Sequence, residues 1–414
     1  MTPLPDGYRL VDVPADRRDD LLLVDAWAFP GSPTPEQAAG WPLPLTWERA
    51  RGVEAADGEL VAVHASYPFT RFPVPGGRTA VSGLTWVGVH PGHRRRGLLR
   101  EMIDDHVARS LTRGEAVSAL FAAEPAIYGR FGYGLAAMDV RLSIPRGAAL
   151  RDVPGSADLQ IRIERMDPDR HGPVIAALHG AVDRPGWATR QSPEQRAASL
   201  HDPEMFRDGA ESERIVLVER DGTPIGYARF RRKGEWLPAG PRGVVRVRDV
   251  VAADPAAAHR LWGVLLDLDL TATVEVGNLP VDDVLLRLLV DPRAALPRLG
   301  DNLWVRLLDV PVALAARRYA APVDVVLEVT DSLLPANARR WRLVGGPDGA
   351  VVTPTDEGGD LALDVRELGA AYLGGVSLVA LAAAGQVAER TPGTLARAAT
   401  AFGWPQAPVC GWVF

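Results

Sequence analysis

The stretch Val87-Gly88-Val89-His90-Pro91-Gly92-His93-Arg94-Arg95-Arg96-Gly97-Leu98-Leu99-Arg100 decides the fold that we expect for this chain. The apolar run Val81 to His90 predicts a strand, a Pro-Gly pair ends it, and apolar residues at helical spacing follow from Leu98. Another apolar run, Val117 to Ala122, predicts the next strand. Residues 81–122 are therefore expected to form a strand–loop–helix–strand unit of an α/β domain.

The loop of this unit has the features of a phosphate-binding turn. Backbone N–H groups at a helix N-terminus are unpaired and point one way, and the helix dipole adds a partial positive charge. Gly97 lets an anion approach the backbone because it has no Cβ. The run Arg94 to Arg96 adds positive charge, although a solvated basic face is an equal alternative. No Gly-x-x-x-x-Gly-Lys-Ser/Thr motif is present, and no Gly-x-Gly-x-x-Gly opens a helix after a strand, which disfavours triphosphate and dinucleotide ligands.

Two motifs carry a resemblance to a known family. Arg94-x-x-Gly97 resembles the Arg/Gln-x-x-Gly-x-Gly/Ala acyl-CoA loop of the GNAT superfamily of N-acetyltransferases, with Leu99 where Gly or Ala is expected. Downstream, Ile127-Tyr128-Gly129-Arg130-Phe131-Gly132-Tyr133-Gly134 follows the strand that ends the unit. Together, His93 to Arg100 and Ile127 to Gly134 resemble the two signatures of the enhanced-intracellular-survival (Eis-type) acetyltransferases.

The resemblance implies α/β and α+β architecture, with tandem GNAT acetyltransferase folds followed by a sterol-carrier-protein-like domain. We place a catalytic domain with the acetyl-CoA loop at 1–150, a second GNAT-like domain without that loop at 151–297, and the sterol-carrier-like domain at 298–414. The length of 414 residues independently predicts two or three domains. Ala252-Ala253-Asp254-Pro255 carries no Arg-x-x-Gly before its helix, so only the first domain is expected to bind acetyl-CoA.

The resemblance also implies roles for single residues. Those implied for acetyl-CoA lie in the strand, the loop and the helix start, and after the next strand: Val87, Gly88, Val89, Arg95, Arg96, Gly97, Leu98, Leu99, Arg100, Ala123 and Glu124. Tyr128 is implied as general acid, since a Tyr hydroxyl with a pKa of about 10 can protonate a departing thiolate with a pKa of about 8.5. The α-carboxylate of Phe414 is implied as general base, delivered from the third domain. From the turn alone, packing is favoured over catalysis for Tyr128, and docking of the apolar C-terminus for stability is the alternative to its catalytic role.

The acceptor site is less well defined by the sequence. Asp25, Trp27 and Phe29 lie in an expected short N-terminal helix, and Trp86 flanks the substrate side of the strand before the loop. A carboxylate among aromatic rings suits a cationic amine through charge pairing and cation–π contact. For Trp27 and Phe29 we rate core packing above ligand contact.

The composition of the chain limits the classes of partner that we expect it to bind. The net charge of −6 disfavours nucleic acid and anionic membranes and favours a cationic substrate. Cys410 is the sole cysteine, and no signal peptide or membrane-spanning run of about 20 apolar residues is evident, so we expect a cytoplasmic protein without disulfide or bound metal.

We therefore predict an acetyl-CoA-dependent N-acetyltransferase that acts on primary amines of aminoglycoside-like or polyamine-like polycations, or on lysine side chains. Resemblance further implies a homo-hexamer. The alternative is a non-catalytic protein that binds lipid or another small ligand in its sterol-carrier-like domain.

Overall fold

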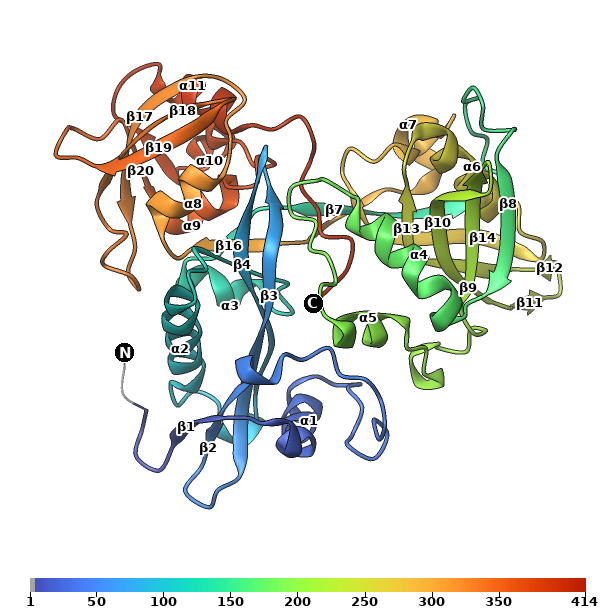
Figure 1. Ribbon diagram of the computed structural model, residues 1–414, viewed down its shortest axis with the longest axis horizontal. Helices are drawn as coiled ribbons and strands as arrows, with labels where there is room; N and C mark the ends of the chain where they lie inside the picture. Colours follow the sequence, from blue (N-terminus) through green and yellow to red (C-terminus); the bar gives the residue numbers. More distant parts are fainter. Residues whose placement is uncertain (1–3) are drawn as a thin grey trace.

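The computed structural model describes residues 4–414, which form three main β-sheets and the helices that pack on them (Figure 1). In Figure 1 the first sheet stands at the centre, the second lies to the right and the third at the upper left. A small hairpin, β11 (Trp236–Leu237) with β12 (Gly240–Pro241), extends from the second part. The expected combination of α/β and α+β architecture is confirmed.

The first sheet has seven strands in the order β1-β2-β3-β4-β5-β16-β6. Their bounds are Arg9–Asp12 (β1), Arg51–Glu54 (β2), Leu60–Val74 (β3), Gly77–Val89 (β4), Val117–Leu120 (β5), Trp304–Leu307 (β16) and Gly134–Leu135 (β6). Helices α1 (Arg18–Ala28) and α2 (Leu98–Thr112) cover opposite faces of this sheet (Figure 1). Most residues of β3 are buried, as expected of a strand covered on both faces.

The strand and helix expected at 81–122 are present, and α2 begins at Leu98 as predicted. Strand β3 continues to Val74, because the rings of Phe69 and Phe72 are buried in the core and hold this segment in the sheet.

The second sheet has the order β15-β7-β14-β13-β10-β9-β8. Its strands are Arg298–Asp301 (β15), Met138–Pro145 (β7), Thr271–Pro280 (β14), Gly243–Ala252 (β13), Thr223–Lys233 (β10), Arg214–Arg220 (β9) and Gln160–Arg165 (β8). The associated helices are α4 (Pro168–Gly180), α5 (Pro193–Leu200), α6 (Pro255–Leu266) and α7 (Leu285–Leu288). Strands β13 and β14 are parallel and are joined through α6, which repeats the β4–α2–β5 arrangement of the first sheet.

The third sheet has five strands in the order β19-β18-β17-β20-β21. Its strands are Gly349–Pro354 (β19), Arg340–Gly346 (β18), Val323–Thr330 (β17), Leu361–Asp364 (β20) and Val387–Glu389 (β21). Around it lie α8 (Val310–Ala316), α9 (Val365–Ala371), α10 (Leu378–Ala383) and α11 (Thr394–Phe402). Its core is continuous with that of the first sheet, since Phe69 and Leu327 belong to one hydrophobic cluster.

Sheet membership does not follow the boundaries that we expected at residues 150 and 297. Strand β7 falls within 1–150 but pairs with β14 and β15 in the second sheet. Strand β16 falls within 298–414 but lies between β5 and β6 in the first sheet. The second sheet therefore contains β7 from the first part and β15 from the third, and the first sheet contains β16 from the third.

A buried ion pair ties the first and third parts together. The Arg306 side chain on β16 donates from Nη2 to both carboxylate oxygens of Asp331 at 2.9 Å, and from Nη1 to the carbonyl oxygen of Phe131 at 2.5 Å. Both charged side chains are almost fully buried. The loop that contains Phe131 is thereby held against the third domain.

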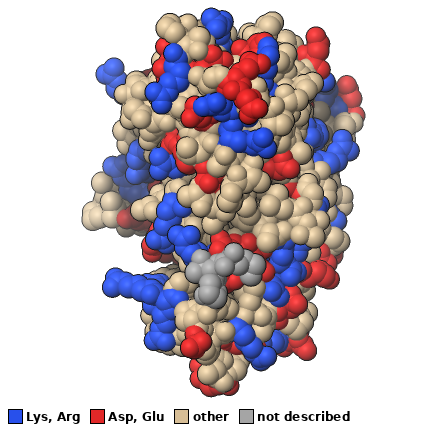
Figure 2. All heavy atoms as spheres, turned by 90° about the vertical axis from the view of Figure 1, so that its left-hand side faces the viewer, with Lys and Arg blue, Asp and Glu red and all other residues tan. Residues whose placement is uncertain are grey.

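Acidic and basic side chains are interspersed over the face shown in Figure 2, with basic ones above and below a notch at its left-hand edge. Within residues 4–414 no helix is both long enough and apolar enough to cross a bilayer. The same residues contain no group of three or more His, Cys, Asp or Glu side chains placed to hold a metal ion.

Candidate active site

A cavity opens where two parallel strands of the first sheet separate. β4 pairs with β5 only from Val81 to Gly83, although β4 continues to Val89. A β-bulge lies beyond the paired part, where Trp86 and Val87 together oppose His64 of β3, and Trp86 has a φ of 55°. Bulges of this kind redirect a strand next to active sites. The divergence leaves a cavity of about 470 Å³ between the strands.

The cavity brings together nearly all residues expected at the acetyl-CoA site. Those that line it are Val87, Gly88, Val89, Arg95, Gly97, Leu98, Leu99, Arg100, Ala123 and Glu124. Arg96 is the exception. Its guanidinium donates to the Tyr8 hydroxyl at 2.6 Å and to the Gly92 carbonyl oxygen at 3.3 Å, so it faces away from the cavity.

Helix α2 presents an open N-terminus to this cavity. Its first turn is preceded by Gly97 with a φ of +83°, and no side chain caps it. Arg95 also has a left-handed backbone, with a φ of 62°. The turn therefore offers backbone N–H groups, the positive end of the helix dipole and the Arg95 and Arg100 side chains, a set that fits the pyrophosphate of acetyl-CoA.

Tyr128 lies at the C-terminal end of the short helix α3 (Pro125–Tyr128) and lines the same cavity. Burial raises the pKa of its hydroxyl to about 12, with a smaller contribution from the Glu124 carboxylate. Its ring packs edge-on against Tyr133, whose hydroxyl is hydrogen-bonded to Ser118 at 2.8 Å. Tyr128 is therefore both a packing residue and a protonated donor at neutral pH that faces the cavity.

The C-terminal tail ends against the first sheet. The Phe414 ring packs edge-on against Phe69 and Phe121, with ring centres 4.9 and 5.2 Å apart. A Cβ placed on Gly83 would lie 3.1 Å from the Phe414 ring. Gly83 is the last residue of β4 that pairs with β5, so Phe414 lies beside the point where the strands separate.

Several hydrogen bonds fix the path of this tail. The Asn302 side chain accepts from the Cys410 N–H at 2.8 Å and donates to the Cys410 carbonyl oxygen at 3.2 Å. The Trp412 indole donates to the Ala188 carbonyl oxygen at 2.6 Å, and Arg190 stacks on the Trp412 ring. Contacts with all three parts of the chain therefore fix the position of Phe414, which is not a free end.

The four acceptor candidates do not lie together. Phe29 lines the cavity, whereas Asp25 is buried in α1, where desolvation raises the pKa of its carboxyl group. The Trp86 indole donates to the Tyr67 hydroxyl at 3.3 Å, and the Tyr67 ring contacts Phe414. Trp27 is 61% exposed and packs against His90.

The expectation of core packing is wrong for Trp27 and Phe29. The buried face of α1 is formed by Leu21, Leu22, Val24 and Asp25, and Trp27 lies outside it. Phe29 follows the helix and is only half buried, in the cavity wall.

Further lining residues were not expected from the sequence: Ala28, His93, Arg94, Ile127, Arg130 and Phe131. Most of these residues lie inside the two sequence motifs at 93–100 and 127–134. Their proximity in the sequence to the expected site residues is the signal that could have identified them. Ala28 carries no such signal, because it reaches the cavity through the packing of α1 on β4.

The fold and this site define a GNAT acyltransferase. Models of the acetyltransferase (GNAT) domain match residues 12–136 and 180–307, and a model of the sterol carrier protein domain matches 310–411. The first range ends just after β6 and the third begins at α8, whereas the second ends with β16, which is a strand of the first sheet.

Relatives define the family more closely. The chain is 43% identical to an uncharacterized N-acetyltransferase of Streptomyces avermitilis, over 90% of this chain and 91% of the relative. It is 33% identical to N-acetyltransferase Eis of Mycobacterium tuberculosis, over 92% of this chain and 93% of the relative. The crystal structure of Eis1 from Mycobacterium abscessus superposes with a TM-score of 0.83 at 32% identity, covering 98% of this chain and 100% of that one. The chain belongs to the Eis-type N-acetyltransferases of the GNAT superfamily.

Proposed function

We propose that this N-acetyltransferase binds acetyl-CoA between β4 and β5 of its first domain and transfers the acetyl group to a primary amine of a small polycation or a lysine side chain. Aminoglycoside-like and polyamine-like amines are the polycations that we favour, because the chain carries a net charge of −6. Acetyl-CoA supplies the activated acyl group. The open turn at Gly97, with Arg95 and Arg100, would hold its phosphates, and the β4 backbone at Val87 and Val89 would orient its pantetheine arm.

In this proposal Tyr128 donates a proton to the leaving group and Phe414 accepts one from the acceptor amine. The Tyr128 hydroxyl, whose pKa burial raises to about 12, keeps its proton at neutral pH and donates it to the departing sulfur. The α-carboxylate of Phe414 orients the ammonium group of the acceptor and accepts its proton. Of the acceptor candidates, Phe29 and Trp86 are proposed to face the acceptor, because Phe29 lines the cavity and Trp86 is linked through Tyr67 to Phe414.

One observation carries the proposal most directly. Phe414 follows the segment 310–411 that the sterol carrier model matches, yet its ring lies on Phe69 and Phe121, which belong to the first acetyltransferase match at 12–136. Docking that served only the stability of the third domain would not require the terminal residue to lie where β4 and β5 separate.

The test compares three chains: wild type, one that lacks Phe414, and one extended by two glycines after Phe414. We expect both altered chains to lose acetyl transfer by about 10²-fold or more while they bind acetyl-CoA as the wild type does. Val413→Ala is the matched control, because the Val413 side chain is 62% exposed and the terminal carboxylate stays in place. Release of free thiol across a panel of amines measures turnover and identifies the acceptor, and normal turnover by the extended chain would exclude the carboxylate as base.

By resemblance we also propose a homo-hexamer and a cytoplasmic location. Sedimentation equilibrium should then give six times the chain mass of 44.5 kDa. The alternative of a non-catalytic ligand carrier is set aside, because the relatives are N-acetyltransferases over nearly the whole chain.

A further inference from the structure

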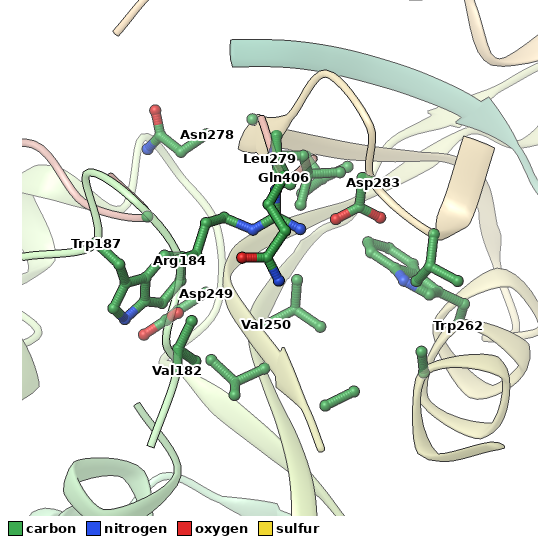
Figure 3. Close-up of a pocket in the computed structure, with 18 of the residues that line it drawn as sticks. Val182, Arg184, Trp187, Asp249, Val250, Trp262, Asn278, Leu279, Asp283 and Gln406 are labelled. Carbon is green, nitrogen blue, oxygen red and sulfur yellow. The ribbon is translucent and has the colours of Figure 1, made fainter. Parts of the chain in front are cut away.

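A second cleft lies in the domain that lacks the acetyl-CoA loop. β13 and β14 pair in parallel from Gly243 to Val247 and separate beyond that point, in front of helix α6. The cavity between them has a volume of about 530 Å³. It occupies the same place in the second sheet as the acetyl-CoA cavity does in the first, and Figure 3 shows its lining.

This second cleft is closed to phosphates. The Asp254 carboxylate caps α6 and accepts from the Ala257 N–H at 2.8 Å, and Pro255 has no N–H to offer. The open turn at Gly97 in the first domain has neither feature. An anion at the start of α6 would meet a carboxylate instead of free N–H groups, so the chemistry of the ligand must differ.

Most charged side chains around the cleft are already paired. Arg184 binds the Asp282 carboxylate at 2.7 Å, and Arg248 binds Glu213 at 3.2 Å. Of the carboxylates, Asp249 accepts from the Tyr227 hydroxyl at 3.0 Å and lies 3.7 Å from Arg190, and Asp254 binds Arg220 at 2.8 Å. The charges of these groups are therefore largely neutralised before any ligand binds.

Asp283 differs from the other charged groups. Its carboxylate points into the cleft toward the Trp262 indole in Figure 3. Oδ1 accepts from the Leu285 N–H at 2.9 Å, and within residues 4–414 no Lys, Arg or His nitrogen lies within 4 Å of the carboxylate. Burial raises the pKa of this carboxyl group, and the nearby Arg184 charge offsets that only in part. The rest of the wall is mainly apolar and includes Val250, Leu279 and the almost fully buried Trp262.

We propose that this second cleft binds a small organic cation, a protonated amine with an apolar body. The ammonium group pairs with the Asp283 carboxylate, and the apolar body lies on Val250 and Leu279. A cavity of this size with a mainly apolar wall and one carboxylate without a cationic partner is typical of a small-molecule site. A cation beside this carboxylate favours its ionised form.

The cleft is also connected to the C-terminal tail. Gln406 and Gly411 line it, and the Ala407 N–H donates to Asp282 at 2.9 Å while Arg184 donates to the Ala407 carbonyl oxygen at 2.6 Å. A bound amine therefore contacts the segment that leads to Phe414. The proposal does not rest on the catalytic roles of Tyr128 and Phe414, because it concerns binding alone.

The probe is 2-phenylethylamine, titrated calorimetrically into the full chain without acetyl-CoA. We expect a binding component that Asp283→Asn weakens at least tenfold and that weakens on acidification, as protons compete for the carboxylate. The neutral analogue 2-phenylethanol should not produce it. Asp269→Asn is the matched control, since Asp269 lies in the same domain, is exposed and pairs only with Arg146 at the surface.

A second variant keeps the test decisive if Asp283→Asn changes the fold. Ala252→Leu narrows the cleft without altering a charge and should remove the same binding component, while acetyl-CoA binding in the first domain and the unfolding midpoint stay those of the wild type. A component that persists in both variants, or an equal affinity for 2-phenylethanol, would overturn the proposal. Either result would leave the acetyl-transfer proposal unaffected.

Discussion

Gly411 offers a way to move the terminal residue without altering it. An ideal Cβ on Gly411 would lie 2.6 Å from Cζ3 of Trp187 and closer still to Cη2, whereas ordinary contact begins at 3.4 Å. The Trp187 ring cannot give way readily, because it is 7% exposed and its indole donates to the His179 carbonyl oxygen at 3.0 Å. In Gly411→Ala the tail must therefore shift by roughly 1 Å, and a misplacement of that size costs about 10²-fold in rate.

The assay follows thiol release from acetyl-CoA with a saturating amine, and calorimetry measures acetyl-CoA affinity separately. We expect kcat to fall about 10²-fold with acetyl-CoA affinity unchanged, since Gly411 does not line the cavity between β4 and β5. Gly403→Ala is the matched control, because Gly403 has a φ of −60° and the nearest atom to its Cβ would lie 3.4 Å away. A wild-type kcat in Gly411→Ala would refute the idea that the position of Phe414 matters.

Three further outcomes are expected. Tyr128→Phe removes a proton donor but little volume, so kcat should fall about 10²- to 10⁴-fold in the thiol-release assay, with an unchanged unfolding midpoint. Undiminished turnover would show that another group is the general acid. Arg306→Met leaves its buried carboxylate partner uncompensated and should cost about 3–5 kcal/mol in urea unfolding, whereas Arg340→Met, at a half-exposed pair, should cost less than about 1 kcal/mol. Burial lowers the pKa of His179 to about 4 and that of His106 well below its usual range, so the unfolded chain takes up protons first as the pH falls below about 6.5. The free energy of unfolding should therefore decrease between pH 6.5 and 4, and a stability that stays constant over this range would contradict the burial of neutral imidazoles.

Local sequence patterns were sufficient for the strand–loop–helix unit and for most of the cavity wall. Helix α2 begins at Leu98 as the apolar spacing predicts, because its start depends on Gly97 and on residues within one turn. The same locality explains why the residues around the loop were identified together.

Side-chain direction could not be predicted in the same way. Three successive arginines look alike in the sequence, but their side chains point in different directions. Arg95 has a left-handed backbone, and Arg96 is hydrogen-bonded to Tyr8 of the N-terminal segment. Trp27 has the composition of a core residue, yet its exposure depends on which face of α1 meets β3 and β4. Both outcomes depend on contacts between residues far apart in the chain.

Strand pairing is the feature of the fold that the sequence predicted least well. Nothing in the residues of the four-residue strand β16 indicates that its partners are β5 and β6, which lie about 187 and 170 residues earlier in the chain. A strand so short carries too little pattern to specify a distant partner.

The insertion of β16 has a consequence for how the protein is made. β6 ends at Leu135, but the strand that joins it to β5 ends at Leu307, so about 170 residues must be synthesised in between. At roughly 5–20 residues per second, the ribosome needs on the order of 10 to 35 s for this stretch. Throughout that time β5 and β6 present unpaired edges on which other nascent chains can pair. The first sheet of this enzyme is thus completed only after the whole of its second domain has been translated.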